Sequence, residues 1–151
     1  SVFYDYYCGC VDGVCNTSLT LPRGSGIEGI GRPRVEASFI PECIDAMLKV
    51  PDELSLAAMR YVSRRLGRRV GGSTGTNLVG VLWLARRMAA AGEGGSIVTI
   101  LCDGGERYAG TYHDPAWYAA QGIDTEAADA AIADAWGGGA LPPLEAVLPP
   151  G

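Results

Sequence analysis

The chain has 151 residues, 48% of them hydrophobic and 19% charged, which suffices for the core of one globular domain and argues against disorder. A formal net charge of -5 argues against nucleic acid or an anionic membrane as a partner, since both attract basic proteins. The longest apolar stretch, residues 78–85, is too short to span a bilayer, and the first residues lack the pattern of a signal peptide. We therefore expect a cytoplasmic protein.

Five cysteines form an odd number at irregular spacing, which argues against the disulfide framework of a secreted protein. We expect reduced thiols. Cys8, Cys10 and Cys15 lie close together, but one interval is shorter than in zinc fingers and no histidine is near. We interpret them as incidental loop cysteines and predict no metal site.

The first third of the chain is mostly loop by sequence. Residues 1–7 have a partly helical period but no strand before them, so we expect the chain to start in the middle of an α/β unit. Residues 8–34 are rich in glycine and proline, which indicates a loop. Residues 47–51 predict a short strand that leads into a helix over Asp52–Leu66, where acids begin the helix, arginines crowd its end and Gly67 stops it.

The remaining elements predict an α/β fold. A helix from about Thr76 to Ala91 is apolar on nearly every side, so we expect it to be largely buried. Residues 96–101 are apolar and β-branched without alternation, which is typical of a strand covered on both faces. Short helices are predicted over 116–121 and Glu126–Trp136, followed by a poorly ordered tail over 137–151. This order indicates a parallel sheet with helices packed on it.

Residues 71–77, Gly-Gly-Ser-Thr-Gly-Thr-Asn, are interpreted as a ligand site at the start of a buried helix. The glycines let the backbone approach another molecule closely, while the hydroxyls of Ser73, Thr74 and Thr76 lie beside the unpaired amides of a helix start. The run is not a nucleotide-binding P-loop, because the Gly-Lys-Ser/Thr ending is absent.

Two further glycine-rich polar segments, 27–31 and 102–108, adjoin predicted elements. A doubly wound fold could bring all three segments to one crevice, although three unrelated turns explain their spacing equally well. Residues 24–29 match a dinucleotide fingerprint by letter but lack the strand that should precede it. His113, the sole histidine, is interpreted as a residue of a surface turn rather than a general base, and Lys49, the sole lysine, as a solvated strand-end residue.

Together, the three glycine-rich segments resemble the C-terminal half of the pyridoxal-phosphate enzymes of the cysteine synthase and cystathionine β-synthase family. The resemblance runs over about residues 1–123, and the strings 28–36 and 71–77 look most like its actinobacterial cysteine desulfhydrase branch. It implies a fold-type II architecture over 1–123, a partial three-layer α/β/α parallel sheet truncated at its N-terminus. Residues 124–151 would be a helical extension and a tail rich in glycine and proline.

The resemblance also implies a site for pyridoxal 5'-phosphate. Ser73 would bond the pyridine nitrogen, with Gly72 and Thr74 beside it, and Cys102 and Asp103 would form the wall near the pyridine edge. A neutral hydroxyl does not hold that nitrogen protonated as a carboxylate would, so the ring is a weaker electron sink. Such tuning suits β-elimination and β-replacement.

Other parts of the family's site are expected outside this chain. Gly29 and Gly31 would belong to the loop that closes over the amino-acid substrate. The Schiff-base lysine, the loop that grips the substrate carboxylate and the phosphate loop all precede the matched region in this family, and Lys49 does not occupy the lysine's place. We therefore expect no catalytic residue here and no activity from the chain alone. The complete enzyme would contain the missing N-terminal half and form a homodimer.

The implied function is β-elimination or β-replacement on L-cysteine or an O-activated serine, as a cysteine desulfhydrase or a cysteine synthase. The residues do not decide between these two activities. The alternative is a non-catalytic, stand-alone module that dimerises or binds a partner. The polar glycine-rich segments favour the enzyme, because a pure interaction module does not need Ser73 and its flanking glycines.

Overall fold

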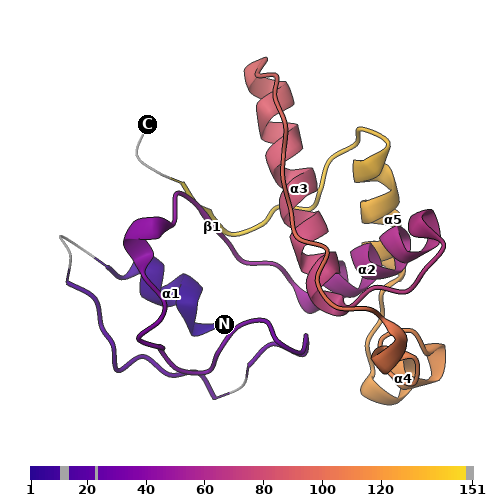
Figure 1. Cartoon of the computed structure of the whole chain (residues 1–151), viewed down its shortest axis with the longest axis horizontal. Helices are drawn as coiled ribbons and strands as arrows, with labels where there is room; N and C mark the ends of the chain where they lie inside the picture. Colours follow the sequence, from indigo (N-terminus) through magenta and orange to yellow (C-terminus); the bar gives the residue numbers. More distant parts are fainter. Residues whose placement is uncertain (11–13, 23, 149–151) are drawn as a thin grey trace. The chain divides into compact units, whose positions relative to one another are not determined.

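A computed structural model describes residues 1–10, 14–22 and 24–148 (Figure 1). The chain divides into two compact units, one formed by residues 1–49 with 144–151 and the other by residues 50–143. Within the described ranges, no helix has the length and apolar character that crossing a membrane requires.

The first unit contains the helix α1 (Val2–Cys8), the 3-10 turn η1 (Pro41–Cys43) and the strands β1 (Met47–Leu48) and β2 (Ala146–Val147). The strands pair antiparallel, with Met47 opposite Val147. Lys49 continues this pairing, since its amide donates to the Glu145 carbonyl at 2.9 Å and its ammonium lies 3.6 Å from the Glu145 carboxylate. Part of the tail predicted to be poorly ordered, 137–151, is therefore a strand, while its last residues, 149–151, lie outside the described chain.

The cysteines of the first unit differ from the expectation of reduced thiols. Cys10 and Cys15 form a disulfide with a Cα–Cα distance of 4.3 Å, whereas Cys8 and Cys43 are free and exposed. The sequence could not reveal this pair, because a bridge requires that the two Cα atoms come within about 7 Å, and a spacing of five residues does not determine that distance.

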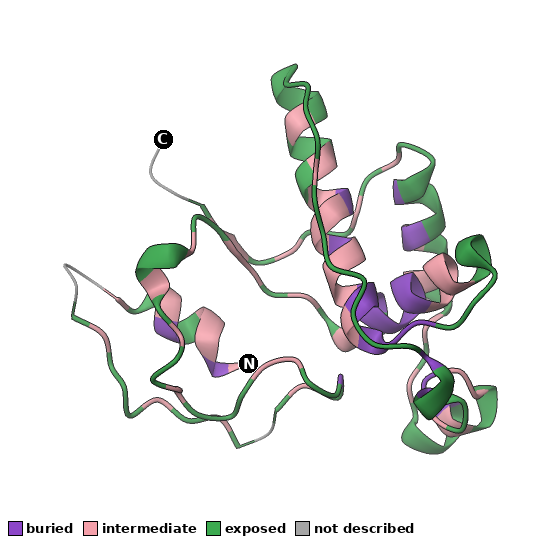
Figure 2. Ribbon diagram, in the orientation of Figure 1, coloured by how far each residue is buried: buried purple, intermediate pink, exposed green. Residues whose placement is uncertain are grey.

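The second unit is helical. It consists of α2 (Asp52–Leu66), α3 (Gly72–Ala91), the 3-10 turn η2 (Glu106–Tyr108), α4 (Pro115–Gln121) and α5 (Glu126–Trp136), and α2 packs against both α3 and α5. Figure 2 shows many of the buried residues of this unit gathered where α2 meets the first half of α3 and α5. The fully buried large side chains there are Leu56, Met59, Val70, Val79 and Ile132.

Helix α2 has the predicted bounds because its ends are set locally. Pro51 precedes it in an extended conformation, and Asp52 and Glu53 lie in the first turn, where negative charge is favourable. Gly67 ends it in the left-handed conformation at φ 64°, and its amide donates to the Arg64 carbonyl.

Helix α3 begins at Gly72, four residues before the predicted start. Its first turns pack on α2, where the Thr76 hydroxyl donates to the Ser55 hydroxyl at 2.9 Å. The second half is less buried than expected, since Leu84 is 40% exposed. The prediction of a largely buried helix therefore holds only for the half that α2 covers.

The expected parallel sheet is absent from the part of the chain that the structure describes. Residues 96–101 run back along α3 without strand pairing, and Val98 and Ile100 are 93% and 71% exposed (Figure 1). An apolar strand forms only where neighbouring strands take up its backbone hydrogen bonds, and no described strand lies beside this segment. The described residues therefore do not show the parallel three-layer sheet that the sequence predicts, and their one sheet is the antiparallel pair β1 and β2.

Candidate functional site

The start of α3 and the turn after residue 101 meet through two hydrogen bonds. The Cys102 amide donates to the Thr74 hydroxyl at 3.0 Å, and the Gly71 amide donates to the Asp103 carbonyl at 3.1 Å. The structure thus brings together the residues predicted to bind the cofactor, which are Gly72, Ser73, Thr74, Cys102 and Asp103.

Close backbone approach at this junction requires glycine. Val70 and Gly104 form an antiparallel bridge, and the Gly105 amide donates to the Arg69 carbonyl at 3.2 Å. A Cβ atom on Gly71 would collide with the Asp103 carboxylate, which is itself held by the Tyr108 hydroxyl at 2.8 Å. The glycine therefore lets the carboxylate lie directly against the helix start.

Ser73 lies in the first turn of α3 and is half-buried. Its hydroxyl makes no hydrogen bond to the described part of the chain. The first amides of a helix also have no partner within the helix, and the helix dipole makes this end positive. The junction therefore offers a neutral hydroxyl beside backbone donors, a set that fits an aromatic ring nitrogen or another polar acceptor.

Cys102 and Asn77 line the next turn of the same junction. The Asn77 amide group donates to the Ile100 carbonyl at 3.0 Å and lies 3.5 Å from the Cys102 sulfur. These contacts hold the end of the extended segment against α3, so the exposed Cys102 thiol stays beside the helix start.

The predicted substrate loop lies in the first unit, as a tight turn held on α1. Gly29 and Gly31 have φ angles of 83° and 72°, which favour glycine. A Cβ on Gly31 would lie 2.7 Å from the Ser1 Cβ, and Ile27 is only 2% exposed. The turn is thus well defined within its own unit, and the role of the two glycines toward substrate stays a prediction.

His113 supports the backbone that precedes the helix start. Its Nε2 lies 3.0 Å from the Val70 carbonyl oxygen, next to Gly71. The following residue, Asp114, caps α4 by accepting from the Ala116 amide at 2.9 Å. The ring therefore contributes to structure beyond the surface turn that the sequence indicated.

A cavity of about 200 Å³ lies in the second unit, lined by Arg60, His113, Pro115, Tyr118, Thr125 and Asp129. Arg60 Nη2 donates to Thr125 Oγ1 and to Asp129 Oδ2, both at 2.6 Å, and its guanidinium lies 4.7 Å from the centroid of the Tyr118 ring. Sequence analysis missed Arg60, since its partners lie 65 and 69 residues away and it has the same residue type as the arginines that end α2.

Burial raises the pKa of the Tyr118 phenol, an effect that the nearby Arg60 guanidinium partly offsets. The phenol donates to the Tyr112 carbonyl at 2.7 Å, so the fold favours its neutral form. Because the folded pKa lies above the unfolded value, this contribution to stability is complete below about pH 10 and is lost as the pH rises through the folded pKa.

We therefore expect the thermal midpoint of the wild-type chain to fall more steeply above pH 10 than that of Tyr118→Phe. The measurement is the midpoint by circular dichroism between neutral and strongly alkaline pH. The substitution also removes a hydrogen bond and so shifts the midpoint at every pH. The quantity to compare is therefore the slope of the midpoint against pH. Parallel curves would show that the phenol does not respond to burial.

No protein-family model matches the chain. Curated proteins do match it: an L-cysteine desulfhydrase of Mycobacterium tuberculosis is 53% identical over 116 residues, which are 77% of this chain and 32% of that protein. A putative cysteine synthase of Sinorhizobium fredii is 40% identical over 62% of this chain and 27% of its own length. An N-(2-amino-2-carboxyethyl)-L-glutamate synthase of Ralstonia nicotianae is 34% identical over 84% of this chain and 36% of its own length.

The chain is therefore a partial homologue of the cysteine synthase family. It spans about a quarter to a third of the length of these three relatives. The resemblance inferred from the glycine-rich segments is thereby confirmed, and its desulfhydrase-like strings agree with the 53% identity to the mycobacterial desulfhydrase.

Proposed function

We propose that this chain is part of a pyridoxal-phosphate-dependent enzyme that performs β-elimination or β-replacement on L-cysteine or an O-activated serine. The observation that carries the proposal is the Ser73 hydroxyl, which has no partner among the described residues and lies at the start of α3. In the chain it stands between Gly71 and Thr74, the two residues that bond the turn over 102–103. The identity to a cysteine desulfhydrase and a putative cysteine synthase supports it.

The residues present fit the pyridine end of the cofactor. When bound, pyridoxal phosphate withdraws electrons from the substrate and so favours loss of its α-proton and β-substituent. Ser73 would donate to or accept from the ring nitrogen without fixing a proton there. The Asp103 carboxylate accepts from the Tyr108 hydroxyl, which fixes it against Gly71 at the helix start.

Other parts of the site must come from elsewhere in the enzyme. The exposed apolar segment 96–101 supports this view, because its composition is that of a covered strand while Val98 is 93% exposed. We propose that the remaining part of the protein supplies strands beside it, the lysine that bonds the cofactor and the phosphate-binding loop. The complete enzyme would then act as a homodimer.

The test replaces Ser73 in a protein that includes the lysine-bearing half. We expect Ser73→Ala to change the absorption of the bound cofactor and to lower the turnover of cysteine by roughly tenfold to a hundredfold, the worth of one hydrogen bond to a group whose charge matters. The measurements are absorption spectra and the release of sulfide or formation of cysteine. Whichever product forms distinguishes the desulfhydrase from the synthase.

Ser73→Thr is the matched control, because it keeps a hydroxyl at the same place and should retain most of the turnover. Unchanged spectra and rates in Ser73→Ala would contradict the assignment of Ser73. If the completed protein binds no pyridoxal phosphate at all, the non-catalytic module becomes the better interpretation.

A further inference from the structure

We propose that Cys10 and Cys15 are a site of reversible oxidation, at which exchange with low-molecular-weight disulfides and thiols controls the order of the turn that contains Gly29 and Gly31. That this turn faces a substrate rests on the proposed function above. The oxidation site and its effect on the turn rest on the contacts of the first unit alone.

Helix α1 holds the turn from its N-terminal end. The Val2 amide donates to the Arg32 carbonyl at 2.9 Å, and the Arg32 amide donates to the Ser1 hydroxyl at 3.3 Å. Val2 is only 1% exposed, so this anchor lies in the core of the unit. The residue directly after Gly31 is therefore fixed to the beginning of the helix.

A second support holds the same segment from its other side. The Leu21 amide donates to the Pro33 carbonyl at 2.7 Å, and Thr20 forms an antiparallel bridge with Arg34. The segment that forms this support is not stabilised by regular secondary structure, since residues 14–22 contain neither a helix nor an extended strand. Its position depends in part on what holds the chain just before it, where Val14 is in an isolated bridge and Cys15 in a disulfide.

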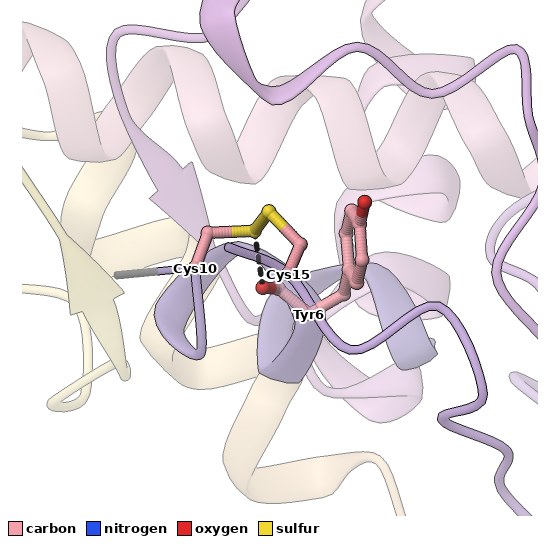
Figure 3. Close-up of a disulfide and its surroundings, with 3 residues drawn as sticks. All are labelled: Tyr6, Cys10 and Cys15. Carbon is pink, nitrogen blue, oxygen red and sulfur yellow. Dashed lines mark hydrogen bonds between the residues drawn. A yellow bond between two sulfur atoms is a disulfide. The ribbon is translucent and has the colours of Figure 1, made fainter. Parts of the chain in front are cut away.

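The disulfide supplies that hold at the other end of α1. The Cys10 amide donates to the Tyr7 carbonyl at 3.4 Å, and the Cys10 sulfur lies 3.1 Å from the Tyr6 carbonyl oxygen (Figure 3). Through the bridge, Cys15 is fixed to the end of the helix, five residues before Thr20. The seven-residue helix therefore fixes both supports of the glycine turn, one by hydrogen bonds and one by a covalent bond.

Reduction would release only the second support. Without the bridge, Cys15 is no longer tied to the helix end, and closing the longer loop to form the Leu21 contact costs more entropy. A Cys10 thiol can donate to the Tyr6 carbonyl, which a disulfide sulfur cannot, so the reduced residue keeps a place at the helix end. The expected change is a loosened turn on an intact α1.

The exchange balances with a small disulfide as the oxidant. One cysteine thiolate attacks the small disulfide and expels one small thiol, and the second cysteine attacks the resulting mixed disulfide and expels the other. Cys10 and Cys15 thus lose two electrons and two protons, which appear on the two small thiols. Reduction by two small thiols reverses each step. The exposed Cys8 thiol, two residues from Cys10, is placed to compete as an alternative partner.

The test equilibrates this chain in mixtures of reduced and oxidised glutathione, then traps free thiols by alkylation and maps them by peptide mass spectrometry. We expect Cys10 and Cys15 to lose alkylation together, while Cys43 and Cys102 remain alkylated. Hydrogen exchange gives the second readout. The Leu21 and Ile30 amides should exchange roughly five- to tenfold faster in the reduced chain, whereas amides of α2 should not change.

Two variants make the result specific. Cys15→Ser should show fast exchange at Leu21 under both conditions, and Cys43→Ser, which also removes an exposed cysteine, should behave as the wild type. A Cys8 bridge to Cys10 or Cys15, no bridge at all, or equal exchange in both states would each overturn the proposal. Neither readout requires cofactor or turnover, so a failed enzyme assay on the completed protein would contradict the proposed function and leave this site standing.

Discussion

Gly75→Ala should destabilise the second unit by about 2–3 kcal/mol, the upper range for overpacking a well-filled core. Gly75 lies on the face of α3 that meets α2, and an added Cβ would collide with the Ser55 carbonyl oxygen and lie 2.7 Å from the Met59 amide nitrogen. Both are main-chain atoms, so no side-chain rotation relieves the overlap and the two helices must separate. The measurement is the free energy of unfolding in urea, followed by helical circular dichroism.

Gly80→Ala is the matched control, in the same helix and of the same chemistry. No heavy atom lies within 4 Å of the Cβ that it would add. We therefore expect it to stabilise the chain by about 0.5–1 kcal/mol, because alanine loses less backbone entropy in a helix than glycine. Similar effects of the two substitutions would show that α3 does not pack on α2 at Gly75.

The predictable parts of this fold were those that neighbouring residues determine. Helix Asp52–Leu66 could be bounded from Pro51, its flanking charges and Gly67, and the short helices α4 and α5 were also found. The start of α3 was placed too late, because its glycines were interpreted as a turn whereas packing on α2 stabilises the first turn as helix.

The failed predictions concerned contacts between distant residues. The composition of residues 96–101 correctly describes an apolar strand in need of cover, but pairing depends on neighbours that the described chain does not provide. The Cys10–Cys15 bridge likewise depends on the distance between the two cysteines in space, a Cα–Cα distance of 4.3 Å. Composition indicates which structure a segment can form, and its contacts with other segments determine which structure it takes.

The candidate site follows the same division. Sequence resemblance selected the cofactor residues, and the structure joins them through Thr74 with Cys102 and Gly71 with Asp103. The sequence resemblance did not select Arg60, or His113, whose ring nitrogen lies beside the Val70 carbonyl. A histidine or an arginine can have many structural roles, and only the residues that it contacts in the folded chain show which role it has.

Arg60→Met should destabilise the second unit by about 2–3 kcal/mol. The Arg60 side chain is 19% exposed and is the one cationic partner of the Asp129 carboxylate among the described residues. The Thr125 hydroxyl also donates to Asp129 Oδ2, at 3.2 Å, while Asp129 Oδ1 is buried with no partner in the described chain. Breaking a buried pair by removing one partner costs about 3–5 kcal/mol, and the 37% exposure of Asp129 reduces that cost. Urea unfolding of the variant measures it.

A double-mutant cycle separates the ion pair from the lost packing on Tyr118. Asp129→Asn removes the charge with little change of shape, so Arg60→Met should be less destabilising in that background by about 1 kcal/mol or more. Arg65→Met is the control from the same helix, because Arg65 lies on the exposed surface over the Tyr61 and Trp136 rings and should cost about 1 kcal/mol or less. If the two arginine substitutions cost the same and the cycle shows no coupling, Arg60 acts through packing alone and the ion pair does not hold α5 to α2.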